Sequence, residues 1–130
     1  MDIDQMYQEN ILEHYKHPKN FGKIENASIE HHEKNPLCGD ELGMFLIIKD
    51  GKIADVKFNG HGCAISQASA SMLTEKVRKM PIKEAEKLTK ESILEMLGIE
   101  LSAVRLKCAL LSLDTLKNSI LIHEKYVVRK

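Results

Sequence analysis

The sequence predicts an α+β fold in which helices pack on one face of a small three-stranded antiparallel sheet. β-type segments gather in the first half of the chain, helical patterns fill the second half, and no repeat or linker separates the two. Strands followed by helices, without regular alternation, favour segregated layers. A chain of 130 residues is long enough to bury one core. We therefore expect a single domain over residues 1–130.

The first predicted helix covers residues 4–17. Tyr7, Ile11 and Tyr15 recur every four residues, which is the spacing of one helix face. Pro18 ends this helix, because proline lacks the N–H that a helix needs. The turn HPKNFG then leads into ASIEHH, residues 27–32, which is predicted to be an edge strand.

The next two strands are predicted to form a hairpin. The apolar run ELGMFLIIK is followed by Asp50-Gly51, a two-residue turn signal. The returning segment KIADVKF alternates, with Ala54, Val56 and Phe58 on one face. Together with the edge strand, these segments predict a three-stranded meander.

Helices follow the hairpin. Small residues from Ala64 open a helix that the Met-Pro pair at 80–81 ends, and IKEAEKL is a second helical stretch. Thr89 is expected to cap the helix KESILEML, and Gly98 to close it. From about Ala103 the chain is predicted to be helical to its end. Its core face carries apolar residues at helical spacing, namely Leu106, Leu110, Leu113, Leu116 and Ile120.

Composition excludes two classes of partner. Lys plus Arg and Asp plus Glu are each 19, so the formal net charge is zero and nothing favours nucleic acid. No apolar run approaches the roughly 20 residues that span a bilayer. The first residues, MDIDQMYQEN, are polar and acidic, unlike a signal peptide. We expect a cytoplasmic protein with no nucleic-acid and no membrane partner.

The three cysteines have unusual settings. An odd number cannot all pair within one chain, so free thiols are expected. Lone cysteines are usually small core residues, and three buried structural thiols are therefore one alternative. Cys38 in NPLCGD and Cys63 in NGHGCAISQ instead adjoin glycines at element boundaries, and Cys108 lies near the start of the last helix. These settings favour a site that uses thiolates.

Hairpin geometry brings the first two cysteines together. Cys38 and Asp40 precede the second strand and Cys63 follows the third, so antiparallel pairing places them at one edge of the sheet. A helix N-terminus favours the thiolate of Cys63, and Lys107 favours that of Cys108. Three thiolates and one carboxylate suffice for tetrahedral zinc or one [2Fe–2S] cluster.

The motifs resemble those of a known family. The order CGD, hairpin, GCAISQASAS and a lone cysteine in the last helix resembles the U-type iron–sulfur cluster assembly scaffolds, namely IscU, SufU and the N-terminal domain of NifU. The run YQENILEHYKHPKNFG also resembles the family's opening helix and HYxxPxNxG turn. The resemblance covers nearly the whole chain. It implies a SufE/NifU-like fold with Cys38, Asp40, Cys63 and Cys108 as ligands of the cluster.

The same resemblance implies partners. Such scaffolds receive sulfur as persulfide from a cysteine desulfurase of the IscS or SufS type and pass the cluster to recipient apo-proteins. We expect Cys108 to accept the persulfide, because Lys107 favours its ionisation, with Cys38 as the main competitor. The oligomeric state stays open, with a homodimer as one alternative.

Two departures keep the function open between subgroups. Lys107 stands where IscU proteins usually carry histidine, as in SufU-like members, and LSAVR replaces the LPPVK segment that a chaperone reads. The 44 residues between Cys63 and Cys108 nevertheless match IscU better than the longer SufU. The chain is thus either a non-enzymatic scaffold for a labile [2Fe–2S] cluster or a zinc-bound sulfurtransferase. A structural zinc domain is the third alternative, and zinc can occupy the site of the isolated protein in each case.

Overall fold

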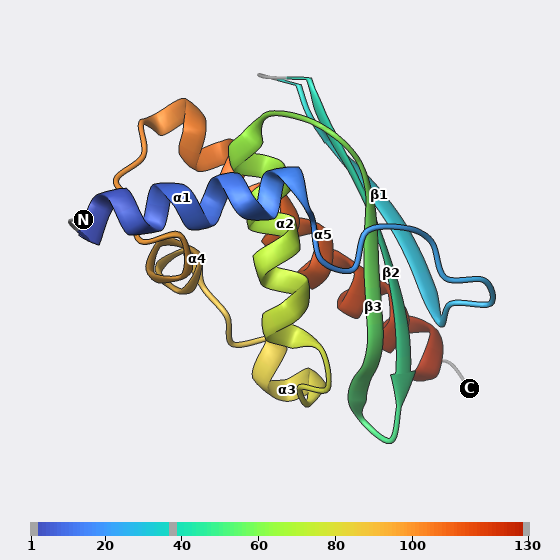
Figure 1. Cartoon of the computed structure of the whole chain (residues 1–130). Coiled ribbons are helices and arrows are strands. Elements are labelled where there is room, and N and C mark those ends of the chain that lie inside the picture. The colour runs from blue at the N-terminus through green and yellow to red at the C-terminus, as the bar shows by residue number, and fades with distance from the viewer. Residues whose placement is uncertain (1–2, 37–38, 129–130) are drawn as a thin grey trace.

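The computed structural model describes residues 3–36 and 39–128, with side chains described for residues 7–36 and 39–125. Five helices and three strands occur in this part of the chain: α1 (Ile3–Lys16), β1 (Ile29–Asn35), β2 (Asp40–Lys49), β3 (Lys52–His61), α2 (Ala64–Val77), α3 (Ile82–Ala85), α4 (Lys90–Leu97) and α5 (Ala103–Val128). The predicted α+β class is confirmed (Figure 1).

The sheet is the predicted antiparallel meander, with strand order β1-β2-β3. Its two edges differ. The outer edge of β3 is covered by the segment that follows α1, because Gly22 N–H donates to Phe58 O at 2.8 Å and Phe58 N–H donates to Asn20 O at 3.0 Å. The Phe21 ring also packs edge-to-face on Phe58, with ring centroids 5.3 Å apart. β1 forms the opposite edge, as predicted.

The predicted inward face of β3 is partly wrong. Val56 and Phe58 are buried as expected, but Ile53 is buried in place of Ala54. The reason is a register shift, since Ile47 lies opposite Asp55 whereas Ile48 lies opposite Ile53. A bulge inserts one unpaired residue and so reverses the alternation of side chains beyond it.

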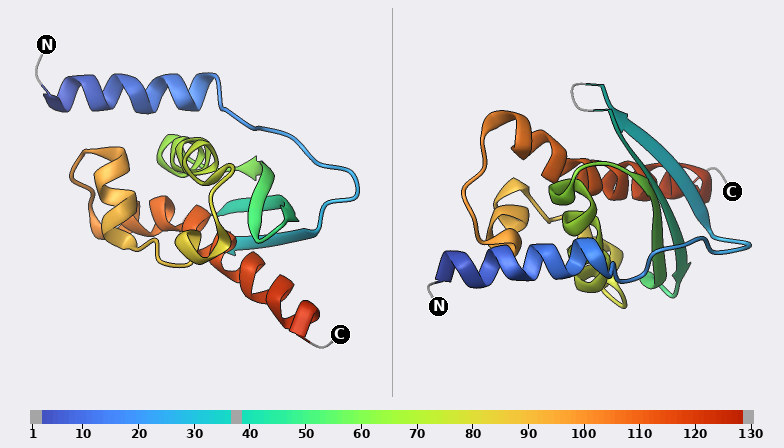
Figure 2. Two further views of the ribbon diagram at one scale, coloured as in Figure 1. Left: turned by 90° about the horizontal axis from the view of Figure 1, so that it is seen from below. Right: turned by 45° about the horizontal axis from the view of Figure 1, so that its top comes forward.

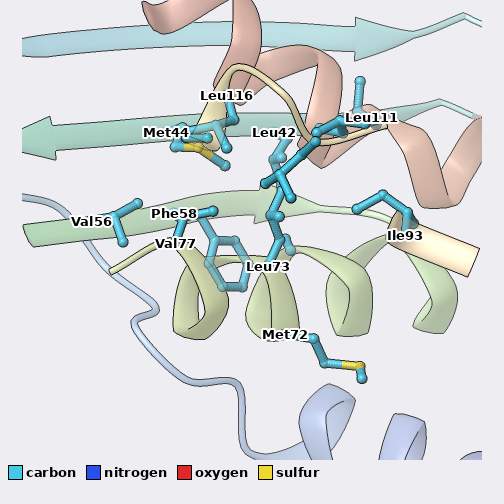
Figure 3. Packing of buried hydrophobic residues seen from close by; sticks show 14 of the residues in the cluster. Leu42, Met44, Val56, Phe58, Met72, Leu73, Val77, Ile93, Leu111 and Leu116 are labelled. Carbon is cyan, nitrogen blue, oxygen red and sulfur yellow. The ribbon is translucent and has the colours of Figure 1, made fainter. Parts of the chain in front are cut away.

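The core lies between the sheet and two helices, α2 and α5. Figure 3 shows side chains from all these elements converging, among them Leu42, Met44, Val56, Phe58, Leu73, Val77, Leu111 and Leu116. α1 lies on α2 on the side opposite α5 (Figure 2). Ser71 joins α1 to α2, because its Oγ lies 2.7 Å from His14 Nδ1 and accepts the N–H of Lys19 at 2.7 Å.

The helix boundaries largely follow the sequence. Thr89 and Ser92 form a capping box at the start of α4, and Gly98 closes it with φ of 70°. The buried face of α1 is narrower than the predicted one. Ile11 is buried, but Tyr7 and Tyr15 are 37% and 45% exposed. The Tyr7 ring packs on Gly98, where no Cβ would fit.

Two helices are shorter than predicted. α2 ends at Val77 rather than at the Met-Pro pair, because Lys79 adopts a φ of 70°, outside the helical region. α3 spans four residues of the predicted IKEAEKL stretch. No helix among the described residues is long and apolar enough to cross a membrane.

Candidate metal centre

Two predicted ligands meet where the sheet joins α2. Asp40 is the first residue of β2, and Cys63 is the N-cap of α2, two residues beyond the end of β3. The register places Glu41 opposite His61, so both ligands reach the same edge. The N–H of Cys63 donates to Asp40 Oδ1 at 3.1 Å. The convergence expected for this pair is confirmed.

Gly62 allows this close approach. A Cβ at this position would overlap Asp40 Oδ1 and Ser66 Oγ. Any larger residue would therefore push the carboxylate of Asp40 away from the start of α2. The glycine that precedes Cys63 in the sequence is thus a steric requirement of the site.

Cys108 reaches the same place from α5. The small side chains of α2 let α5 approach closely, since Ser69 Oγ donates to Ala109 O at 2.7 Å and lies 3.2 Å from Ser112 Oγ. Because of this contact, one ligand atom each of Asp40, Cys63 and Cys108 lie within 4.8 Å of one another. The structure therefore brings together three of the four predicted ligands. The fourth, Cys38, lies outside the described residues.

The three ligands differ in their exposure to solvent. Asp40 and Cys108 are each 2% exposed, whereas Cys63 is half-buried. Cys63 and Cys108 are not bonded to each other in a disulfide. The expectation that Cys108 lies near the start of the last helix needs refinement, because α5 begins at Ala103 and Cys108 lies beyond its first turn.

The donor set suits a metal. Two sulfurs and a carboxylate oxygen are ligands that zinc and iron both accept. The geometry allows these three residues to hold a zinc ion or part of an iron–sulfur cluster, with a thiol on the rim open to exchange.

The nearby histidines bind carboxylates. His61 lies 3.4 Å from Glu41, and its side chain is 71% exposed. Lys34 lies 3.0 Å from the same carboxylate. The hydrogen bond and charge of Lys34, and to a smaller extent His61, lower the pKa of Glu41. His31 and His32 pair with Glu33 and Glu30 respectively, so neither is placed at the site, as expected.

Sequence reasoning missed one residue beside the site. Gln67 follows Cys63 by one helical turn and is 8% exposed, and its Nε2 has no hydrogen-bond partner within the described part of the chain. Residues four apart share a helix face, and long helical side chains point back over the preceding turn. The spacing of Cys63 and Gln67 was the available signal.

Lys107 borders a hollow next to the site. The hollow has a volume of about 260 Å³ and lies between the end of β1 and α5, where Asn35, Pro36 and Leu111 also line it. Lys107, which precedes Cys108 in the sequence, shares this hollow with the carboxylates of Glu33 and Asp114.

A small antiparallel sheet with helices on one face, carrying thiols and a carboxylate where a strand enters a helix, defines a class of proteins that hold a metal centre at a sheet edge. The family model described as "NifU-like N terminal domain" matches residues 6–130, and the chain belongs to this family.

Relatives from both subgroups are similar to the chain. It is 37% identical to the iron-sulfur cluster assembly scaffold protein IscU 1 of Archaeoglobus fulgidus, over 88% of this chain and 74% of that one. It is 34% identical to the zinc-dependent sulfurtransferase SufU of Bacillus subtilis, over 92% of each chain. A solved structure of a SUF-system scaffold protein from Fervidobacterium islandicum matches with a TM-score of 0.74 and 32% identity, over 92% of this chain and 99% of that one.

Proposed function

We propose that the chain is a scaffold on which [2Fe–2S] clusters are assembled and from which they pass to apo-proteins. The observation that carries this proposal is the meeting of Asp40, Cys63 and Cys108 within 4.8 Å. Cys38, two residues before Asp40, supplies the fourth ligand in this proposal. The cluster is cargo, so the site must both hold it and release it.

Two features of the site support release. A carboxylate oxygen is a weaker ligand for the cluster than a thiolate, so Asp40 provides one bond that exchanges readily. Cys63 lies at the rim, where a recipient's thiol can approach it. Buried Cys108 keeps the cargo attached while the other bonds exchange.

The sulfur is proposed to arrive through Cys108. Its thiolate attacks the outer sulfur of the desulfurase persulfide, the sulfur–sulfur bond breaks, the desulfurase leaves as a thiolate, and Cys108 becomes the persulfide. Lys107, the residue before Cys108, supplies a positive charge that would attract the incoming anion. Because Cys108 is 2% exposed, this transfer requires a local opening of the site.

Mass spectrometry after a single desulfurase turnover tests this assignment. Added sulfur on the peptide that contains Cys108 is the expected result. Sulfur found on Cys38 or Cys63, with none on Cys108, would refute the acceptor and leave the scaffold function standing.

A zinc-bound sulfurtransferase is the second candidate. Lys107 in place of histidine and the 34% identity to SufU favour it. In this case the same residues hold zinc, which keeps the thiols in place and shields them until the desulfurase docks. Cys108 would be the thiol that accepts the sulfur.

Metal and sulfide analysis of anaerobically purified protein, followed by reconstitution with iron and sulfide, separates the two candidates. The scaffold predicts acid-labile sulfide, a reddish colour and sulfur-to-iron charge-transfer absorption, all lost in Cys63→Ser. Stoichiometric zinc that iron and sulfide do not displace would overturn the scaffold proposal and favour the transferase.

The proposed partners are a cysteine desulfurase of the IscS or SufS type, recipient apo-proteins and a second copy of the chain. The proposed location is the cytoplasm. The odd number of cysteines, three, supports this location, because a reducing compartment keeps thiols from pairing.

A further inference from the structure

Residues 29–34 of β1 have no backbone partner on their outer side within the described part of the chain. β1 is the terminal strand of the sheet, whereas the other terminal strand, β3, is covered by the chain around Phe21 and by the backbone bond from Ile53 N–H to Met80 O. Figures 1 and 2 show β1 along the side of the molecule that faces away from α4. An open edge presents free N–H and C=O groups and can pair with another strand.

The charged side chains of β1 are complementary to those of β1 in a second copy. The strand reads IEHHEKN. If a second copy pairs antiparallel with His32 on the two-fold axis, Glu30 of each copy lies opposite Lys34 of the other. His31 of each copy then lies opposite Glu33 of the other. Opposite charges placed directly across a strand pair are stabilising, and like charges are destabilising.

Neighbouring registers lack this match. A two-fold axis perpendicular to the sheet keeps inward residues opposite inward residues, so the register can change only in steps of two. One such step leaves Lys34 opposite Ser28 and Glu33 opposite Ile29, and keeps only Glu30 opposite His32. A step the other way places Glu33 opposite Glu33. The charges therefore select the pairing centred on His32.

The side chains of Glu30 and Lys34 can change partners, whereas His31 and Glu33 already pair with each other at 2.9 Å within one copy. Within one copy Glu30 lies 2.8 Å from His32 and Lys34 lies 3.0 Å from Glu41. The side chains of Glu30 and Lys34 are 55% and 75% exposed, so these pairs are weak and can be exchanged for contacts across an interface.

An apolar surface lies beside the same edge. A hollow of about 430 Å³ is lined by His31 and Glu33 from β1 and by Leu121 and Ile122 from α5. Leu121 is 61% exposed. Because His31 and Glu33 flank the axis at His32, the hollow of one copy faces that of the other, and pairing would bury Leu121.

We propose that two copies of this chain associate through antiparallel pairing of their β1 edges, giving a continuous six-stranded sheet. Asn35, at the end of β1, lies opposite Asp40 at the site. The two metal centres thus fall at opposite ends of the paired strands and stay open to their partners. The interface is independent of what the site holds.

Sedimentation of the metal-free full-length protein in reducing buffer tests the pairing. We expect the wild type to form a concentration-dependent dimer. Glu30→Lys and Lys34→Glu should each weaken it by about tenfold or more, because each variant replaces two attractive pairs by two repulsive ones. An equimolar mixture of the two variants should dimerise again, since each Lys then faces a Glu.

Glu95→Lys on α4 is the matched control, because it makes the same charge change at an exposed position away from β1. It should dimerise like the wild type. A wild type that stays monomeric into the millimolar range would refute the interface, and so would single variants that dimerise as tightly as wild type. A mixture that stays monomeric would equally overturn it. None of these outcomes bears on cluster assembly, because the protein carries no metal in this experiment.

Discussion

Asp40 serves two purposes at the metal centre. Its carboxylate is a candidate ligand, and its Oδ1 accepts the N–H of Cys63, which fixes the start of α2. A hydrogen bond from the backbone and a bond to the cargo therefore compete for the same oxygens. This competition is a physical reason for a weak fourth ligand.

We predict that Asp40→Ala retains a reconstituted cluster severalfold longer than the wild type. The variant loses the exchangeable oxygen ligand and its water-attracting charge. The decay of charge-transfer absorption in the presence of a chelator measures the effect. Glu100→Ala, which removes an exposed carboxylate elsewhere, should decay like the wild type. Faster loss in Asp40→Ala would show that Asp40 is not the exchangeable ligand.

Gln67 offers a second test at this scale. Its Nε2 is buried and lacks a partner among the described residues, which costs about 1–3 kcal/mol. Gln67→Met keeps the volume and removes the donor, so the metal-free protein should gain about 1 kcal/mol in its free energy of unfolding. Ser69→Ala, which removes the donor to Ala109 O, should lose about the same amount. Denaturant titration measures both, and a destabilised Gln67→Met would mean that the amide is satisfied.

At the scale of elements, the features that the sequence predicted correctly are those that depend on neighbouring residues. The cap at Thr89, the close at Gly98 and the turn at Asp50-Gly51 depend on residues within one turn of each other, and all are confirmed. The bulge between Ile47 and Ile48 was not predictable, because Ile53 is held by backbone hydrogen bonds with Lys79 and Met80, which are distant in the sequence.

The same distinction applies to the site. Hairpin geometry predicted that Asp40 and Cys63 meet, since antiparallel register is a local property. The burial of Cys108 depends on how closely α5 approaches α2, and that distance is set by Ser69 and its contacts forty residues away. No sequence pattern near Cys108 predicts its burial.

The contact between α5 and β1 makes stability depend on pH. Asp114 on α5 has its pKa raised from 3.8, first by burial and then by the charge of Glu33, while Lys117 opposes the shift. A raised carboxyl pKa means that ionised Asp114 destabilises the fold. This penalty is absent below pH 3.8, develops as pH rises from 3.8 through the folded pKa, and is fully present at neutral pH.

We therefore predict that Asp114→Asn is more stable than the wild type at pH 7. The gain should be at most about 0.5 kcal/mol, because the side chain is exposed enough for water to screen it. Thermal unfolding at neutral and acidic pH measures the difference, which should vanish in acid. Glu100→Gln should show no such trend. A wild type that is the more stable protein at pH 7 would contradict the prediction.

At the scale of the whole molecule, the core is built without the metal centre. The buried cluster of apolar residues joins the sheet to α1, α2, α4 and α5, and the candidate ligands lie outside it at the sheet edge. A domain with such a core does not need a metal to fold, unlike a small zinc domain.

We predict that removing bound metal with a chelator leaves the fold intact. The far-ultraviolet circular dichroism should be unchanged, and the melting temperature should fall only by the amount that ligand binding contributes. Cys63→Ser should give the same dichroism as the stripped wild type. Unfolding upon chelation would instead support a structural zinc domain.

The meeting of Asp40, Cys63 and Cys108 also sets the order of events during synthesis. These residues come from β2, the start of α2 and α5, so the complete set is present only after α5 has left the ribosome and docked on α2. Domains form progressively as the chain emerges, at about 5–20 residues per second. An unfinished chain therefore presents scattered thiols rather than a metal centre. In the proposed scaffold, iron and sulfur would meet these three ligands together only after α5 has docked on α2.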